Sequence, residues 1–87
     1  MDLNELRLRI DAVDDEMVRL FCERMRISAE IAQIKAVNGL AVYDPEREKR
    51  KLEDVMGKAS EYREYIGALY ARVFELSRDI QEKKLQK

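Results

Sequence analysis

The sequence has no histidine, no tryptophan and only one cysteine among its 87 residues. Cys22 therefore has no partner for an internal disulfide, and no histidine or second thiol is available to complete a zinc site. We expect Cys22 to be a small hydrophobic residue of the core. We also expect neither a metal nor a cofactor, because the chain offers no metal-binding cluster and no reactive cysteine.

An excess of charge of one sign is also lacking. The chain has seventeen Lys and Arg residues and eighteen Asp and Glu residues, which gives a net charge of −1. No broad basic field would attract nucleic acid or an anionic membrane, so an anion must be recognised locally. The start, MDLNELRLR, is not typical of a secretory signal, and no apolar run reaches the roughly 18 residues of a membrane span. We expect a cytoplasmic protein with neither nucleic acid nor a membrane as its partner.

Charged residues make up 40% of the chain, with three glycines and one proline, and this composition favours long helices. A first helix is predicted over 3–37, ending at Asn38-Gly39, where glycine can take the left-handed conformation. Asp44 should cap a second helix that has Pro45 at its first position and ends at Gly57. Ser60 should cap a third helix that runs to the C-terminus. The fold class is all-α, with a long, a short and a long helix in a single domain over 1–87.

Both long helices carry apolar residues at alternating steps of three and four. In the first helix these residues are Leu3, Leu6, Ile10, Val13, Met17, Leu20, Ile27, Ile31 and Ile34. In the third they are Tyr62, Ile66, Leu69, Val73, Leu76 and Ile80. A helix of about 35 residues spans roughly 50 Å, far more than the diameter of an 87-residue globule. We therefore expect an intertwined homodimer in which the long helices cover each other.

Polar residues interrupt or flank these apolar stripes. Arg24 takes an apolar position of the first helix, and Lys35, eleven residues later, lies within about 20° of the same face. Ser77 and Gln81 share one face of the third helix, and Glu48 lies at the core edge of the second. Each feature also has an ordinary interpretation: Arg24 could pair with a glutamate, Ser77 could bond its own backbone, and Asp-Pro is a common helix start.

Taken together, these residues place two cations, an amide, a hydroxyl and an acid on the inward faces of three helices. Buried charge has to be paired or bound to a ligand. The pattern predicts a pocket for a small polyanion that carries hydroxyl groups, and it is not typical of nucleophilic or metal chemistry.

The whole chain resembles the all-helical chorismate mutases, the chorismate mutase type II family. The resemblance depends on LRLRIDAVDDEMVRLFCERM, AEIAQIK, VYDPERE and ELSRDIQ, which together cover residues 6 to 81. It implies an intertwined dimer and the rearrangement of the small molecule chorismate to prephenate, on the route to phenylalanine and tyrosine. The site residues that it implies are Arg7, Arg24, Lys35, Asp44, Arg47, Glu48, Ser77 and Gln81.

The resemblance also assigns roles. Arg7 and Arg24 would clamp the carboxylates, and Lys35 and Gln81 would donate to the ether oxygen of the breaking bond. Glu48 and the backbone near Asp44 would hold the ring hydroxyl, Ser77 would bond a carboxylate, and Arg47 would line the mouth or reach a carboxylate through water. Lys35, Gln81 and Arg24 are the expected catalytic residues.

Arg7 and Arg24 lie about 25 Å apart along one helix, so we expect each site to take them from different subunits. Two alternatives stay open. An isochorismate-pyruvate lyase shares this fold and much of this pocket, and a non-catalytic helical dimerisation module would use the polar positions only to set register.

Overall fold

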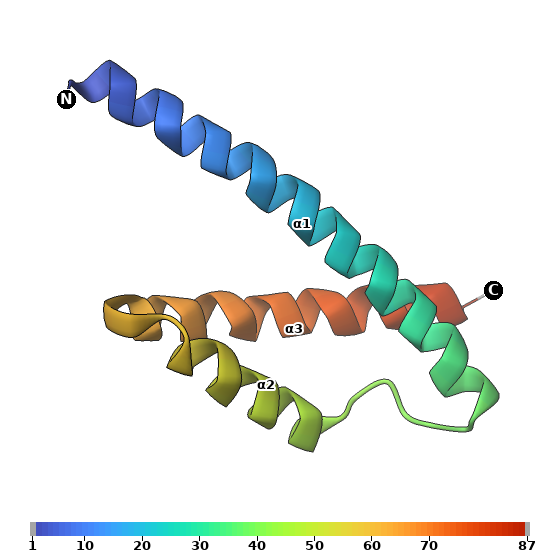
Figure 1. Ribbon diagram of the computed structural model, residues 1–87. Helices are drawn as coiled ribbons and strands as arrows, with labels where there is room; N and C mark the ends of the chain where they lie inside the picture. Colours follow the sequence, from blue (N-terminus) through green and yellow to red (C-terminus); the bar gives the residue numbers. More distant parts are fainter. Residues whose placement is uncertain (1, 87) are drawn as a thin grey trace.

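The computed structural model describes residues 2–86, and all regular structure in that part of the chain is helical (Figure 1). The elements are α1 (Leu3–Val37), α2 (Pro45–Gly57), a 3₁₀ turn η1 (Ser60–Tyr62) and α3 (Arg63–Leu85). The expected order of a long, a short and a long helix is confirmed.

Local chemistry explains the ends of the first two helices. The Asp2 carboxylate accepts a hydrogen bond from the Glu5 amide at 2.8 Å, which caps α1. Gly39, directly after the C-terminal cap, has φ +68°, a left-handed conformation that glycine adopts without a steric penalty. At the start of α2 the Asp44 carboxylate accepts from the Arg47 amide at 3.0 Å, and Pro45 takes the first helical position. These predicted boundaries are confirmed.

The prediction that Ser60 caps the third helix is wrong. Ser60 has φ +51°, whereas an N-cap residue needs an extended backbone. It begins η1 instead, and the Tyr62 amide bonds the Ala59 carbonyl oxygen at 3.0 Å. Tyr62 precedes α3 without any side-chain cap. The chain has only two residues between α2 and η1 in which to reverse direction, so Ser60 takes the strained backbone conformation of a tight turn.

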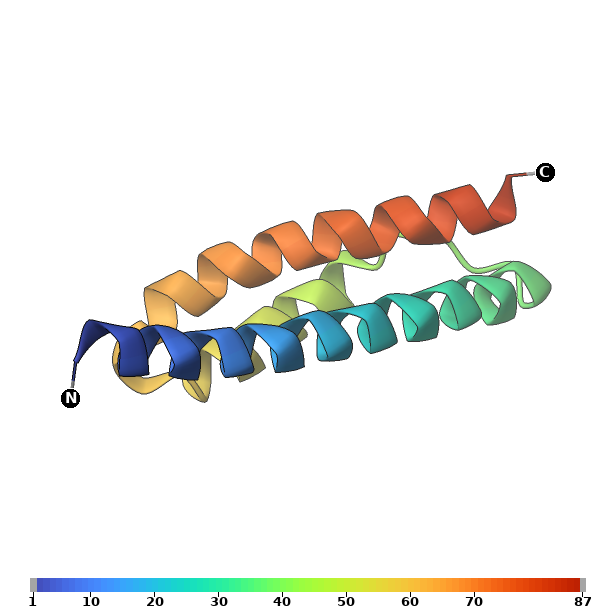
Figure 2. The same cartoon turned by 90° about the horizontal axis from the view of Figure 1, so that it is seen from above.

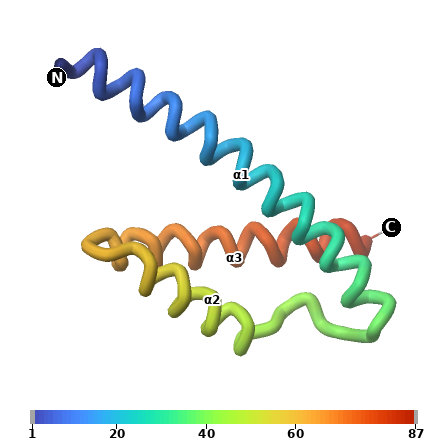
Figure 3. The backbone as a smooth tube through the Cα atoms, in the orientation of Figure 1, coloured from blue at the N-terminus to red at the C-terminus, as the bar shows by residue number. Residues whose placement is uncertain are grey.

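α3 is the central element of the single chain. It packs against α1 and against α2, while those two helices do not pack on each other within residues 2–86. Figures 2 and 3 show the C-terminal half of α1 beside the C-terminal half of α3, with α2 running back along α3. Gly67 permits the close approach of α2, because a Cβ there would meet the Met56 methyl carbon at 3.0 Å.

The buried core of one chain is small. Its apolar members are Ala32, Val73 and Phe74, and the polar residues Ser28, Ser77 and Gln81 are buried with them. The apolar stripe of α1 is largely exposed, because the N-terminal half of this helix diverges from α3 (Figure 1). Cys22 is exposed too, so the expectation that it lies in the core is wrong for the single chain. Within residues 2–86 no helix is both long enough and apolar enough to cross a bilayer.

Candidate active site

A cavity of about 600 Å³ lies where the C-terminal half of α1 meets the start of α2 and the C-terminal half of α3. Five cationic side chains and two acidic ones line it, so a small anion inside it would meet a net positive field. The lining residues are Arg24, Ile27, Ser28, Ile31, Lys35, Val42, Asp44, Arg47, Glu48, Lys51, Phe74, Ser77, Arg78 and Gln81.

α1 contributes Arg24 and Lys35 to the same wall of the cavity, as their spacing predicts. The Arg24 guanidinium lies 5.9 Å from the ring centroids of both Tyr70 and Phe74, and the two rings meet edge to face. Within residues 2–86 Arg24 forms no ion pair, so its charge is held by aromatic faces and stays available to an anion. The alternative in which Arg24 pairs with a glutamate is therefore not found within residues 2–86.

Lys35 is tied to the segment that follows α1. Its Nζ donates a hydrogen bond to the Val42 carbonyl oxygen at 2.8 Å, and the side chain is half-buried. This contact fixes the ammonium at the cavity wall and leaves two of its three N–H donors for a ligand.

Three buried polar side chains form a hydrogen-bonded chain between α1 and α3. The Ser28 and Ser77 hydroxyl oxygens lie 2.8 Å apart, and Gln81 Nε2 donates to Ser77 Oγ at 3.2 Å. Gln81 is only 6% exposed, yet its Oε1 has no hydrogen-bond partner among the described residues. An unpaired buried amide oxygen costs free energy. Turning the amide by 180° would instead let the Ser77 hydroxyl donate to Oε1.

At the start of α2, the carboxylate of Glu48 is paired within the chain. Arg78 Nη1 donates to both Glu48 oxygens, at 2.5 and 2.6 Å, and its guanidinium lies 5.0 Å from the ring centroid of Tyr43. Its hydrogen bonds with Glu48 raise the pKa of Arg78 above the ordinary value, although partial burial opposes the rise. Arg78 is therefore a cation at any pH at which the protein is folded.

The cavity brings together seven of the eight residues expected to form the site: Arg24, Lys35, Asp44, Arg47, Glu48, Ser77 and Gln81. Arg7 does not line it. This residue is exposed on the N-terminal half of α1, which diverges from α3 (Figure 1). The expectation that one chain cannot bring Arg7 and Arg24 to the same ligand agrees with this placement.

Sequence reasoning missed three residues of this region. Arg78 was not assigned to the site, although it directly follows Ser77. Tyr43 and Ser28 were not assigned to the site either. Helical spacing could have placed Ser28, which lies one turn after Arg24. No local signal pairs Arg78 with Glu48, because thirty residues separate them.

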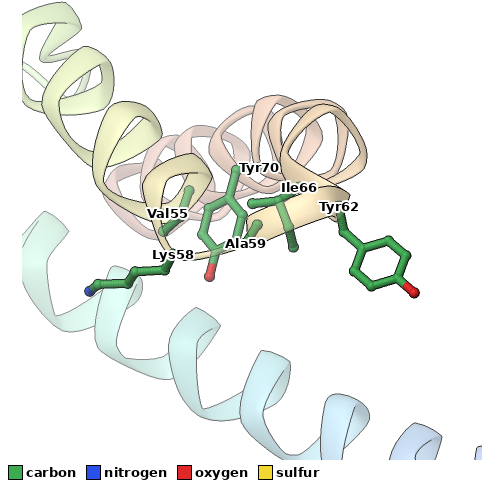
Figure 4. A pocket seen from close by; sticks show the side chains of 6 residues that line it. All are labelled: Val55, Lys58, Ala59, Tyr62, Ile66 and Tyr70. Atoms are coloured by element: carbon green, nitrogen blue, oxygen red, sulfur yellow. The ribbon is translucent and has the colours of Figure 1, made fainter.

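A second hollow, of about 360 Å³, lies between the end of α2, η1 and the start of α3. Figure 4 shows its lining residues Val55, Lys58, Ala59, Tyr62, Ile66 and Tyr70 on the side that faces α1. The lining is almost entirely apolar, and Lys58 is the one charged residue among these six. A small polyanion would find no converging donors on them, so the cavity that contains Arg24 is the better candidate site.

Three helices of an all-α protein surround a cationic cavity with a buried amide, and this arrangement suits a small polyanion. The chain belongs to the chorismate mutase type II family, whose sequence model matches residues 6–82. A solved structure of a form II chorismate mutase from Thermus thermophilus is 32% identical and has a TM-score of 0.90. The match covers 97% of this chain and 98% of that one.

Three curated relatives are also named as chorismate mutases, and each is longer than this chain. The chorismate mutase of Methanocaldococcus jannaschii is 40% identical over 47 residues, which are 54% of this chain and 48% of that protein. The bifunctional chorismate mutase/prephenate dehydratase of Buchnera aphidicola is 36% identical over 84 residues, or 93% of this chain and 22% of that protein. The corresponding bifunctional protein of Aquifex aeolicus is 38% identical over 55 residues, 63% of this chain, and the match spans 15% of its length.

Proposed function

We propose that the protein is a chorismate mutase, an isomerase that converts chorismate to prephenate in the cytoplasm, with residues 1–87 acting as one catalytic domain. The observation that carries the proposal is the convergence of Arg24, Lys35 and Gln81 on one cavity. Chorismate is a dianion with a ring hydroxyl, and the cavity offers cations, an amide and a carboxylate to match it.

The reaction is intramolecular: an ether C–O bond breaks while a C–C bond forms, and no proton is transferred. Catalysis therefore requires a folded substrate conformer and stabilisation of developing charge. The guanidinium of Arg24 binds one carboxylate in a two-pronged geometry, and its position over Tyr70 and Phe74 fixes that geometry before the substrate arrives.

Negative charge grows on the ether oxygen as the C–O bond breaks. Lys35 and Gln81 donate hydrogen bonds to this oxygen, in an arrangement comparable to an oxyanion hole. Gln81 Nε2 carries two hydrogens: one is donated to Ser77 Oγ, and the other can be donated to the ether oxygen. Glu48 and the backbone near Asp44 hold the ring hydroxyl, Ser77 bonds a carboxylate, and Arg47 lines the mouth of the cavity.

The site is completed by Arg7 of a second copy of the chain, in a homodimer. The shape of one chain supports this part of the proposal. It exposes 7083 Å² of surface, whereas a compact monomer of 10.3 kDa would expose about 5,400 Å². Its radius of gyration is 16.0 Å, against about 12 Å for a compact 87-residue domain. An excess of roughly 1,700 Å² per chain is within the range of an obligate interface.

Exposed apolar side chains along α1 offer a surface that a second long helix could cover. Those of α1 are Leu3, Leu6, Leu8, Ile10, Val13, Met17, Val18, Leu20, Phe21, Ile27, Ile31, Ile34 and Val37. The apolar hollow beside Tyr70 lies on the side of α3 that faces α1 (Figure 4). Sedimentation should therefore give a mass of twice 10.3 kDa, and a monomer at micromolar concentration would contradict the dimer.

The decisive experiment for the activity is a spectrophotometric assay of chorismate loss, with the product identified by chromatography and mass. Prephenate is expected as the only product. Isochorismate is tested in parallel, since release of pyruvate from it would indicate a lyase instead. A purified, folded dimer that leaves chorismate unchanged would contradict the proposed function.

A further inference from the structure

Arg78 is the cationic residue of the cavity with the shortest contacts to its own chain. It has no role in the mechanism proposed for the reaction. It lies on α3 and binds Glu48 on α2 through Nη1, at 2.5 and 2.6 Å. The same guanidinium stacks on Tyr43, in the segment between α1 and α2, at 5.0 Å. One side chain thus connects three segments at the edge of the cavity. The pair is partly shielded from water, with 29% of the Arg78 side chain and 24% of the Glu48 side chain exposed.

An acidic side chain in a cavity for a dianion creates an electrostatic problem. The cavity contains two such residues. The Asp44 carboxylate is used as the cap of α2, where it accepts from the Arg47 amide at 3.0 Å. The Glu48 carboxylate would repel an incoming carboxylate unless a cation balanced it. Arg78 supplies that cation within hydrogen-bonding distance.

The contact also restricts the geometry of Glu48. Both of its oxygens accept from the same Nη1, so the carboxylate plane is held in one orientation. Each oxygen can accept a second hydrogen bond, and the carboxylate can therefore still accept one from a hydroxyl group of a ligand. The Tyr43 ring adds a second contact to the guanidinium, which lies 5.0 Å from its centroid.

We propose that Arg78 is a positioning residue that acts through Glu48: it orients this carboxylate toward the hydroxyl of the substrate and cancels its charge, so that a hydroxylated dianion can bind. The inference rests on the proposed function. It assigns to Arg78 an effect on substrate binding rather than on the breaking bond, because Glu48 faces the ring hydroxyl in that scheme.

The test is a double-mutant cycle with chorismate as the substrate. Arg78→Met removes the charge and keeps a similar length, and it should raise KM about tenfold while kcat changes less than about threefold. In a Glu48→Gln background no carboxylate charge is left to balance, so adding Arg78→Met should change KM by less than about threefold. Arg78→Lys keeps the charge and loses the planar guanidinium that lies over Tyr43, and its KM should lie between those of the unmodified protein and Arg78→Met.

Arg72→Met is the matched control. Arg72 lies on the same helix and also bonds a glutamate, Glu75, but its side chain is 66% exposed and does not line the cavity. Its kinetic constants should equal those of the unmodified protein. Circular dichroism and thermal melting establish that each variant is folded at the assay temperature, and Arg78→Gln replaces Arg78→Met if the latter is not.

Three outcomes would overturn the inference. An unchanged KM in a folded Arg78→Met variant would mean that Arg78 has no role in binding. An equal rise of KM with and without the Glu48 carboxylate would mean that Arg78 contacts the substrate directly. If the unmodified protein does not convert chorismate, the proposed function fails first, and the inference falls with it.

Discussion

Ser28 on α1 and Ser77 on α3 are forty-nine residues apart in sequence, and their hydroxyl oxygens lie 2.8 Å apart in the buried interior. Ser77 also accepts a hydrogen bond from Gln81, so the two long helices are joined directly beneath the amide proposed to face the breaking bond. A contact of this kind stabilises the helix pair and also orients the Gln81 amide.

Breaking this contact should destabilise the protein in a graded way. Ser28→Ala removes one buried hydrogen bond and should lower the free energy of unfolding by about 1 kcal/mol. Ser77→Ala removes two and leaves both Ser28 and the Gln81 amide without a protein partner, so its loss should be larger, about 2 kcal/mol. Denaturant unfolding at a fixed protein concentration measures both values. Equal stability of Ser77→Ala and the unmodified protein would show that the hydroxyl chain does not support the fold.

The proposed site, shared between two subunits, predicts complementation between two inactive variants. In a dimer that combines Arg7→Ala with Arg24→Ala, one site retains both arginines and the other has neither. Refolding an equal mixture should therefore restore up to about a quarter of the normal number of sites, because half of the dimers are hybrid. Each variant refolded alone is the control. A mixture that is no more active than its parents would contradict a site formed from two subunits.

The helices and most of the cavity could be predicted from sequence because their signals are local. The Asp44-Pro45 start, Gly39 and the eleven-residue spacing of Arg24 and Lys35 each act within a few turns of one helix. Ser60 was misassigned because the same residue type serves a helix cap and a tight turn, and only the path of the chain distinguishes them. The Arg78–Glu48 pair and the Arg24–Tyr70 contact depend on how α2 and α3 approach α1 and each other, which no spacing within one helix specifies.

Lys35 should contribute mainly to the rate of the chemical step. Lys35→Ala removes a cation whose partner charge is largest in the transition state, so kcat should fall by about 10²–10³-fold. The variant also loses the bond to the Val42 carbonyl oxygen, so its fold has to be verified by circular dichroism. Lys49→Ala is the control, because Lys49 is exposed on α2 and outside the cavity. A folded Lys35→Ala dimer with a normal kcat would remove this residue from the mechanism.

Gln81→Glu should make kcat/KM depend on pH, because the introduced side chain can ionise. The glutamine amide donates a hydrogen bond at any ordinary pH, so the unmodified enzyme should have a nearly constant kcat/KM through neutrality. Glutamate has almost the same shape but donates only when it is protonated. Burial at this position raises the pKa of the introduced carboxyl, whereas the nearby cations Arg24 and Lys35 lower it.

Near pH 7 the introduced side chain should therefore be largely ionised and would face the growing negative charge on the ether oxygen. Activity should rise as the pH falls, by up to about tenfold per pH unit above the apparent pKa, because the protonated fraction rises in that proportion. The measurement is kcat/KM from about pH 4.5 to 8.5. Gln33→Glu makes the same chemical change at an exposed position of α1 and should follow the unmodified profile. If folded Gln81→Glu follows it as well, residue 81 does not face the breaking bond, and the developing charge must be stabilised by Lys35 and other donors.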